Sequence, residues 1–299
     1  MEKLKGYTFA LTSAVLLGLM AVLVKIVLDM NIATSTVIFF RFTISSLFLA
    51  VFLKVRGVSC RINREQFLLL AWVGSVGYGV MNLCYYGAFT LIPVGLTSMI
   101  HYVYPVIVVF MARALYHQTF SKKVYGALVL AVAGAMILSF SDFGKINLLG
   151  VVLALLAGVC YGIYAVYMDH PNIKELHGLV VVFYLSVFAM ASSFIFSLPR
   201  QALPWQGVTW EAWGVMVVIS LLCTVLALFL FREAVVRIGS THTTILSTME
   251  PVSAAVLGVL VFGEPLGPGM LIGSALIIIA VLLVTFQKQA SPTNIDQNT

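Results

Sequence analysis

Long apolar runs alternate with short polar segments along almost the whole chain. A helix needs roughly 20 mostly apolar residues to cross the hydrocarbon core of a bilayer. Ten runs of about that length follow one another, and no polar region between them is large enough for a soluble domain. The pattern therefore predicts an all-α integral membrane protein with ten transmembrane helices. The predicted spans cover about residues 6–28, 34–54, 66–88, 94–115, 122–140, 147–168, 177–197, 209–232, 240–262 and 266–286.

The second half of the chain repeats the pattern of the first. When Pro105 is aligned with Pro251, 146 positions later, the flanking residues agree in kind. Each half has five predicted helices, an odd number, so the second half must cross the membrane in the opposite sense and form an inverted repeat. We expect the repeats at 1–143 and 144–287, followed by a disordered polar cytoplasmic tail at 288–299. The aligned pairs are Ala88 with Ala234, Ile92 with Ile238, Thr97 with Thr243, His101 with Ser247 and Tyr104 with Glu250.

The composition favours a membrane protein and argues against several other classes. Hydrophobic residues make up 61% of the 299 residues and charged residues only 9%, whereas a soluble domain carries about 25% charged residues. The net charge of +6 does not predict nucleic-acid binding, because the basic residues lie in short loops between apolar spans. The four cysteines form no pair motif, and we find no phosphate-loop, metalloprotease or hydrolase motif. We therefore expect no enzyme, no cofactor and no metal site.

The distribution of lysine and arginine predicts the orientation. If the N-terminus is cytoplasmic, thirteen basic residues lie on the inner side and three on the outer side. Cytoplasmic loops carry the excess of basic residues, so we expect a multi-pass protein of the cell membrane with both termini cytoplasmic and the lipid bilayer as a partner. The inner residues are Lys3, Lys5, Lys54, Arg56, Arg61, Arg64, Arg113, Lys122, Lys123, Lys174, Arg232, Arg237 and Lys288, and the outer ones are Lys25, Lys145 and Arg200.

Polar side chains inside the apolar spans are the candidate substrate-binding residues. A polar group in hydrocarbon is costly and needs a partner, which makes each one a functional candidate. Helix packing and aromatic belts at the membrane surface are the alternatives. Spacings of one or two helical turns place the candidates of each span on one helix face. They are Tyr78, Asn82 and Tyr85 in the third span, Thr97 and His101 in the fourth, Tyr161 and Tyr164 in the sixth, and Thr243 and Ser247 in the ninth.

Three ionisable residues, Glu250, Arg41 and His101, lie deep in the predicted spans. They are candidates for proton coupling, since histidine carries a proton near neutral pH, or for an ion pair between Glu250 and Arg41. A contact from Arg41 to a substrate carboxylate and purely structural bonding to neighbouring helices stay open. Pro105 and Pro251 lack a backbone N–H and free a carbonyl one turn earlier, so we expect hinges there.

Near the end of the chain stands the stretch REAVVRIGSTHTTILSTMEPVSAAVLGVLVFGEPLGPGMLIGSALIIIAVLLV. It resembles the ten-helix EamA-type members of the drug/metabolite transporter superfamily, and the resemblance extends over about residues 6–286. Glu250-Pro251 and Gly263-Glu264 match the family pattern, whereas the first repeat has Tyr104 before its proline and His117-Gln118 in place of Gly-Glu. The resemblance implies a carrier that is not driven by ATP. It also implies a central cavity lined by the first, third, fourth, sixth, eighth and ninth helices.

The residues and the resemblance together predict a secondary transporter that exports a small metabolite, such as an amino acid, by alternating access. Efflux of cationic drugs by proton antiport and uptake of a nutrient are the alternatives. A purely structural membrane protein would not account for polar residues at matching depths in both halves. The expected partners besides lipid are a small-molecule substrate and, if transport is coupled, protons, while monomer and homodimer both stay open.

Overall fold

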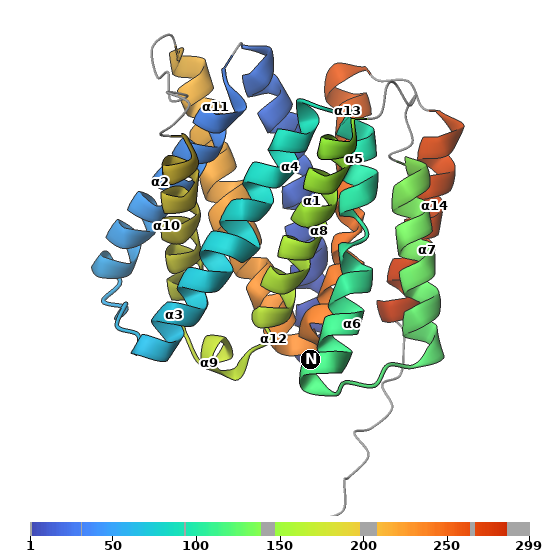
Figure 1. The fold of residues 1–299 in the computed structure, drawn as a ribbon, viewed down its shortest axis with the longest axis horizontal. Helices are drawn as coiled ribbons and strands as arrows, with labels where there is room; N and C mark the ends of the chain where they lie inside the picture. Colours follow the sequence, from blue (N-terminus) through green and yellow to red (C-terminus); the bar gives the residue numbers. More distant parts are fainter. Residues whose placement is uncertain are drawn as a thin grey trace, which may run out of the picture.

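The computed structural model describes residues 2–30, 32–92, 94–138, 147–197, 208–263 and 267–285. Within these ranges every regular element is a helix, and the helices run side by side along the molecule (Figure 1). Among the described residues, seven helices are long and apolar enough to cross a membrane by length and composition, and shorter apolar helices pack among them. Large apolar side chains such as Phe110, Val129, Leu260 and Leu271 are exposed, as expected of a protein whose solvent is lipid.

The described helices form ten spans, which confirms the predicted all-α fold of two inverted five-helix repeats. The first repeat begins with α1 (Glu2–Asp29) and α2 (Thr34–Val55). Its third span consists of α3 (Arg64–Trp72), η1 (Val73–Val80) and α4 (Met81–Phe89). The fourth span consists of α5 (Val94–His101) and α6 (Tyr104–Tyr116), and the fifth is α7 (Lys122–Leu138). The second repeat begins with α8 (Leu148–Tyr167), the short α9 (Pro171–Lys174) and α10 (Gly178–Ser197). Its eighth span consists of α11 (Trp210–Ser220), η3 (Leu221–Leu226) and the first part of α12 (Ala227–Ser247). The ninth span consists of the rest of α12 with α13 (Met249–Phe262), and the tenth is α14 (Pro268–Thr285). The segments η1 and η3 are π-helical.

The eighth span extends beyond its predicted end near residue 232. Helix α12 continues to Gly239, where a φ of 80° and a ψ of 162° interrupt it, a conformation that glycine adopts at little cost. The helix continues through Arg232, Glu233 and Arg237 because these charged side chains pair with one another. A run of charged residues therefore does not end the helix here.

The fourth and ninth spans are broken at matching points. Tyr102 and Val103 separate α5 from α6, and Thr248 separates α12 from α13. Each break precedes a proline near the start of the next helix, where a missing N–H leaves no helical hydrogen bond unmade. Tyr102 and Thr248 are 146 positions apart, so the two repeats are interrupted at the same place. The hinge role of Pro105 and Pro251 stays a prediction.

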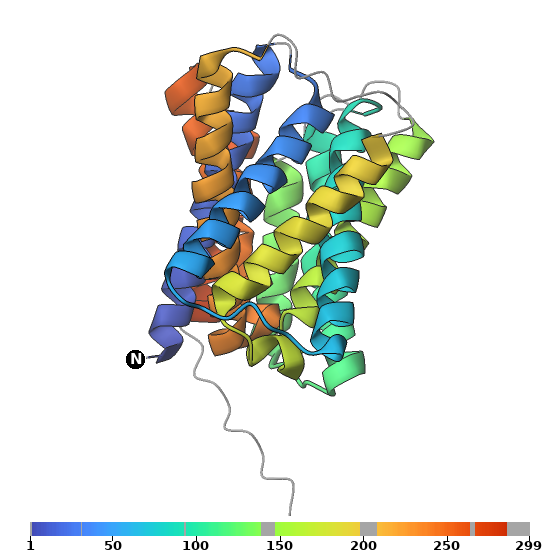
Figure 2. The same ribbon diagram turned by 90° about the vertical axis from the view of Figure 1, so that its left-hand side faces the viewer.

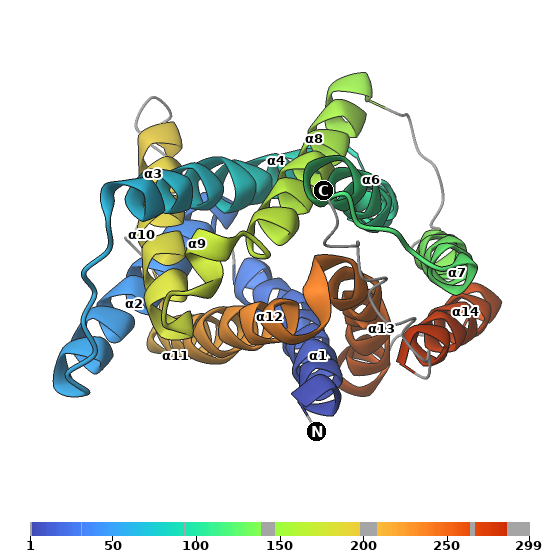
Figure 3. The same cartoon turned by 90° about the horizontal axis from the view of Figure 1, so that it is seen from below.

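The two repeats interlock. Helix α1 packs on α12 and α13, whereas α8, its equivalent in the second repeat, packs on α4, α5 and α6. Glycines permit these close approaches. A Cβ added to Gly158 would lie 3.1 Å from the carbonyl oxygen of His101, and a Cβ added to Gly18 would lie 2.7 Å from the carbonyl oxygen of Glu250. Helix α2 packs on α10 and α11 (Figure 2), and α7 pairs with α14 at one edge of the molecule (Figure 3). Each helix break is therefore held by the first helix of the other repeat.

Candidate functional site

Five of the predicted substrate-binding residues lie in one aromatic cluster. The ring centroids of Tyr85 and His101 are 4.6 Å apart, and those of His101 and Tyr161 are 5.6 Å apart. Tyr164 continues the cluster, at 5.5 Å from Tyr161 and 5.2 Å from Tyr78. These residues come from η1, α4, α5 and α8. The cluster therefore forms where the broken fourth span meets the π-helical third span and the middle of α8.

Further rings contact this cluster that were not among the predicted binding residues, Tyr104 and Phe231 among them. Tyr104 lies 4.5 Å from Tyr161 and 5.4 Å from His101, and Phe231 of α12 stacks on Tyr164 at 5.4 Å. The position of Tyr104, aligned with the acidic residue of the second repeat, was a signal in the sequence. Phe231 stands in an apolar run and gave none.

Three polar atoms of the cluster are buried without a hydrogen-bond partner among the described residues. They are Nδ1 of His101 and the hydroxyl oxygens of Tyr104 and Tyr164. An unsatisfied buried polar group costs about 1–3 kcal/mol, and buried polar groups in native proteins are mostly satisfied. Three of them in a single group of touching rings give this region an unused capacity for hydrogen bonding.

Glu250 joins the cluster from the second repeat. Its carboxyl group lies close enough to Tyr102, Tyr104 and Tyr161 to interact with them electrostatically. Tyr102 lies in the break of the fourth span, and Glu250 lies two residues beyond the break of the ninth. The breaks of the two spans therefore bring Tyr102 and Glu250 close to each other. The predicted role of Glu250 in proton coupling stays a prediction.

The predicted ion pair between Arg41 and Glu250 stays a prediction, and the hydrogen bonds of Arg41 go to neutral groups. Arg41 is only 1% exposed; its Nε donates to the Thr224 hydroxyl at 2.7 Å and its Nη2 to the Tyr78 hydroxyl at 2.7 Å. Its Nη1 donates to the Asn82 side-chain oxygen at 3.4 Å. None of these three acceptors is a carboxylate, since all of them are neutral groups of the third and eighth spans. Arg41 thus contacts two of the predicted binding residues.

The hydroxyl residues of the fourth and ninth spans, Thr97, Thr243 and Ser247, are fully buried. Thr243 donates to the carbonyl oxygen of Gly239 at 2.8 Å, and Ser247 donates to that of Thr243 at 2.9 Å. Hydroxyl groups in helices often bond the carbonyl one turn earlier. Both groups therefore have a partner in their own helix, and substrate binding by these three residues stays a prediction.

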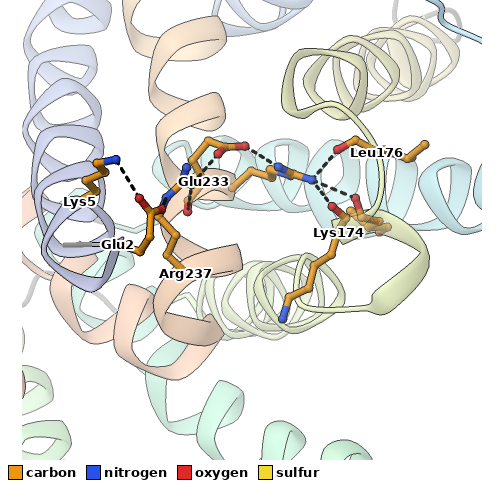
Figure 4. Close-up of polar contacts among 8 residues, drawn as sticks. Glu2, Lys5, Lys174, Leu176, Glu233 and Arg237 are labelled. Carbon is orange, nitrogen blue, oxygen red and sulfur yellow. Dashed lines mark hydrogen bonds and ion pairs between the residues drawn. The ribbon is translucent and has the colours of Figure 1, made fainter.

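Charged side chains join α1 to α12 at the end of the molecule that holds the N-terminus (Figure 4). Arg237 bonds Glu233 at 2.5 Å and Glu2 at 3.3 Å, and Lys5 bonds Glu2 at 2.8 Å. Because α1 belongs to the first repeat and α12 to the second, these ion pairs connect the two repeats.

The same network reaches the segment around α9. Arg232, which is 5% exposed, pairs with Glu233 and donates to the carbonyl oxygens of Leu176 at 2.6 Å and Lys174 at 2.7 Å. A third and longer bond, at 3.3 Å, goes to the Ile173 carbonyl oxygen. One buried guanidinium therefore fixes the chain between α8 and α10 to the eighth span.

The interlocked repeats, the broken helices and the buried polar cluster define a multi-pass membrane carrier. The model of the EamA-like transporter family matches residues 4–140 and 148–286, and the chain belongs to this family. It is therefore a transporter and not an enzyme, as the sequence predicted.

Relatives and a solved structure agree with this assignment. The threonine/homoserine exporter RhtA of Escherichia coli (strain K12) is 29% identical over 265 residues, which cover 86% of this chain and 84% of the relative. The uncharacterized transporter YwfM of Bacillus subtilis (strain 168) is 31% identical over 177 residues, 56% of each chain. A crystal structure with 18% identity superposes with a TM-score of 0.77 over 94% of this chain and 96% of that chain, which shows a shared fold.

Proposed function

We propose that this protein is a secondary transporter of the cell membrane that exports a small amino acid, such as threonine or homoserine, by alternating access. The similarity to RhtA over most of both chains supports the substrate class and the direction. Both termini would be cytoplasmic, which agrees with the basic residues gathered at the end that holds the N-terminus.

The observation that carries the proposal is the group of polar atoms in the aromatic cluster. An amino acid presents an ammonium group, a carboxylate and, for threonine or homoserine, a hydroxyl group. The carboxyl group of Glu250 and the tyrosine ring faces attract an ammonium group. Nδ1 of His101 and the hydroxyls of Tyr104 and Tyr164, which have no hydrogen-bond partner among the described residues, can bond the carboxylate and the hydroxyl. The substrate would thus satisfy groups that are costly when left unpaired.

Alternating access would use the paired helix breaks. Tyr102 and Glu250, at the two breaks, lie close to each other, and the breaks precede Pro105 and Pro251, so a change in either helix would alter the site. Protonation of Glu250 or His101 would couple substrate release to a proton gradient. Efflux from proteoliposomes with and without an imposed pH gradient tests this coupling.

The proposal is tested by binding and transport of the purified protein. A ligand at 100 times its Kd stabilises the folded state by roughly 2.7 kcal/mol, so a thermal-stability screen with all amino acids should give a shift with threonine or homoserine. His101→Ala and Tyr104→Phe should abolish the shift, whereas Tyr167→Phe, whose ring stacks on His170, is the matched control and should keep it. No shift with any amino acid, together with no threonine efflux from proteoliposomes, would refute the proposal.

A second candidate is efflux of cationic drugs by proton antiport, which the placement of one carboxyl group among tyrosine rings favours. Cells that express the protein would then resist lipophilic cations, and Glu250→Gln would remove the resistance. Thermal shifts with such cations but not with amino acids would decide for this function.

A further inference from the structure

Arg41 is bonded to both repeats at positions that the duplication makes equivalent. Its partners at 2.7 Å, Tyr78 and Thr224, are 146 positions apart. The same offset aligns Pro105 with Pro251. One side chain of α2 therefore contacts matching points of the third and eighth spans.

Both of these points lie in π-helical segments. Tyr78 belongs to η1 (Val73–Val80), and Thr224 belongs to η3 (Leu221–Leu226). Single π-helical turns are rare, occur mostly at functional sites and are places where helices kink. A matched pair of them gives each repeat a bend at the same position of its third helix.

Side chains on neighbouring residues complete the bonding of both segments. Asn82 donates its amide N–H to the carbonyl oxygen of Tyr78 at 2.8 Å. The hydroxyl of Ser45, one turn after Arg41 on α2, lies 2.7 Å from the carbonyl oxygen of Arg41 and 3.1 Å from that of Ser220, directly before η3. Helix α2 thus contacts the η3 region at two levels, and through Arg41 it also reaches η1.

We infer that Arg41 is a positioning residue of the transport cycle, which couples the two π-helical segments so that both repeats bend together. The guanidinium is suited to this because its donors point in fixed directions, whereas a lysine ammonium is one point charge on a flexible stem. Tyr78, held by Arg41, in turn touches Tyr164 in the ring cluster at 5.2 Å. A bend in either repeat would therefore reach the proposed site.

The first test is a double-mutant cycle of Tyr78→Phe and Thr224→Val, made with Arg41 and again with Arg41→Met. Efflux of labelled threonine from proteoliposomes gives KM and the maximal rate, so this readout rests on the proposed function. With Arg41 present, the two changes should be non-additive in maximal rate by roughly twofold or more. With Arg41→Met they should be additive. Ser13→Ala, which removes a 2.8 Å bond to the Ala227 carbonyl beside η3, is the matched control and should be additive with Tyr78→Phe.

The second test needs no substrate. Spin labels at Leu4→Cys on α1 and Glu65→Cys on α3, both exposed positions, are placed in a variant without the four native cysteines. The distance distribution between the labels should be narrow with Arg41 and broader with Arg41→Met. Circular dichroism checks that the Met variant folds; the acceptors that lose Arg41 are neutral, so no carboxylate is left alone. Arg41→Lys, which keeps the charge but not the guanidinium donors in fixed directions, should broaden the distribution as well.

Three results would overturn the inference. They are additive effects of Tyr78→Phe and Thr224→Val with Arg41 present, an unchanged distance distribution in both Arg41 variants, and a large rise in KM with an unchanged maximal rate in Arg41→Lys. The last would place Arg41 on the substrate. If the unmodified protein moves neither threonine nor homoserine, the proposed function fails, and the distance measurement alone decides on Arg41.

Discussion

Replacing Arg232 by glutamine should destabilise the protein more than any other single change in the charged network. The side chain is 5% exposed and gives hydrogen bonds to three backbone carbonyls besides its pair with Glu233. Removing one partner of a buried charged network costs about 3–5 kcal/mol. Glu233 keeps its 2.5 Å bond to Arg237, so no carboxylate is left alone, and we expect a loss near the lower end, about 3 kcal/mol.

The assay is reversible unfolding of the purified protein in mixed micelles with increasing denaturing detergent, followed by circular dichroism. Hydrogen exchange of the amides between α8 and α10 should rise in the same variant, because Arg232 no longer binds the carbonyls of that segment. Lys5→Gln is the control, since its ion pair with Glu2 is exposed and should contribute nothing measurable. Equal stability of the Arg232 and Lys5 variants would refute the reasoning.

Two further predictions concern glycine positions, and the same unfolding assay measures both. Gly18→Ala should destabilise the folded protein by about 1–3 kcal/mol, because its new Cβ would lie 2.6 Å from the Cβ of Ser253. Gly126→Ala is the control and should not destabilise it, since nothing lies within 4 Å of a Cβ there. Equal effects of the two changes would contradict the packing argument. Gly263→Ala should cost about 1 kcal/mol, because Gly263 ends α13 with a φ of 66°. At the equivalent position His117 ends α6 with a φ of 49°, so His117→Gly should stabilise, and a loss of stability there would show that the His117 side chain outweighs the backbone strain.

The spans were predictable because a bilayer imposes their length and polarity directly on the sequence. The extension of α12 past Arg232 was not, because the charged residues there are paired with a carboxylate beside them and with carbonyls from 56 to 59 positions earlier. Only the folded chain brings those carbonyls near. A polar run at the end of an apolar one therefore reads as a loop in the sequence and remains helix in the structure.

The candidate site was predictable in part. Depth within a span identified Tyr78, Tyr85, Tyr161 and Tyr164, and the structure brings them together with His101 in one ring cluster. The partners of Arg41 were not predicted, since a π-helical segment has the same apolar pattern as an α-helical one. Thr224 could have been found, because the offset that aligns the two prolines also aligns Thr224 with Tyr78.

The two repeats share their backbone breaks but differ in the chemistry that they place there. The break of the first repeat carries His101, Tyr102 and Tyr104, whereas that of the second carries Ser247 and Glu250. Matching breaks in inverted repeats allow the site to open to either side by equivalent motions. Unlike side chains at those breaks would make one wall of the proposed site acidic and the other neutral and aromatic. A substrate with unlike ends, such as a zwitterion, would then keep a single orientation through the cycle. A site with two identical walls would bind the same substrate in either of two orientations.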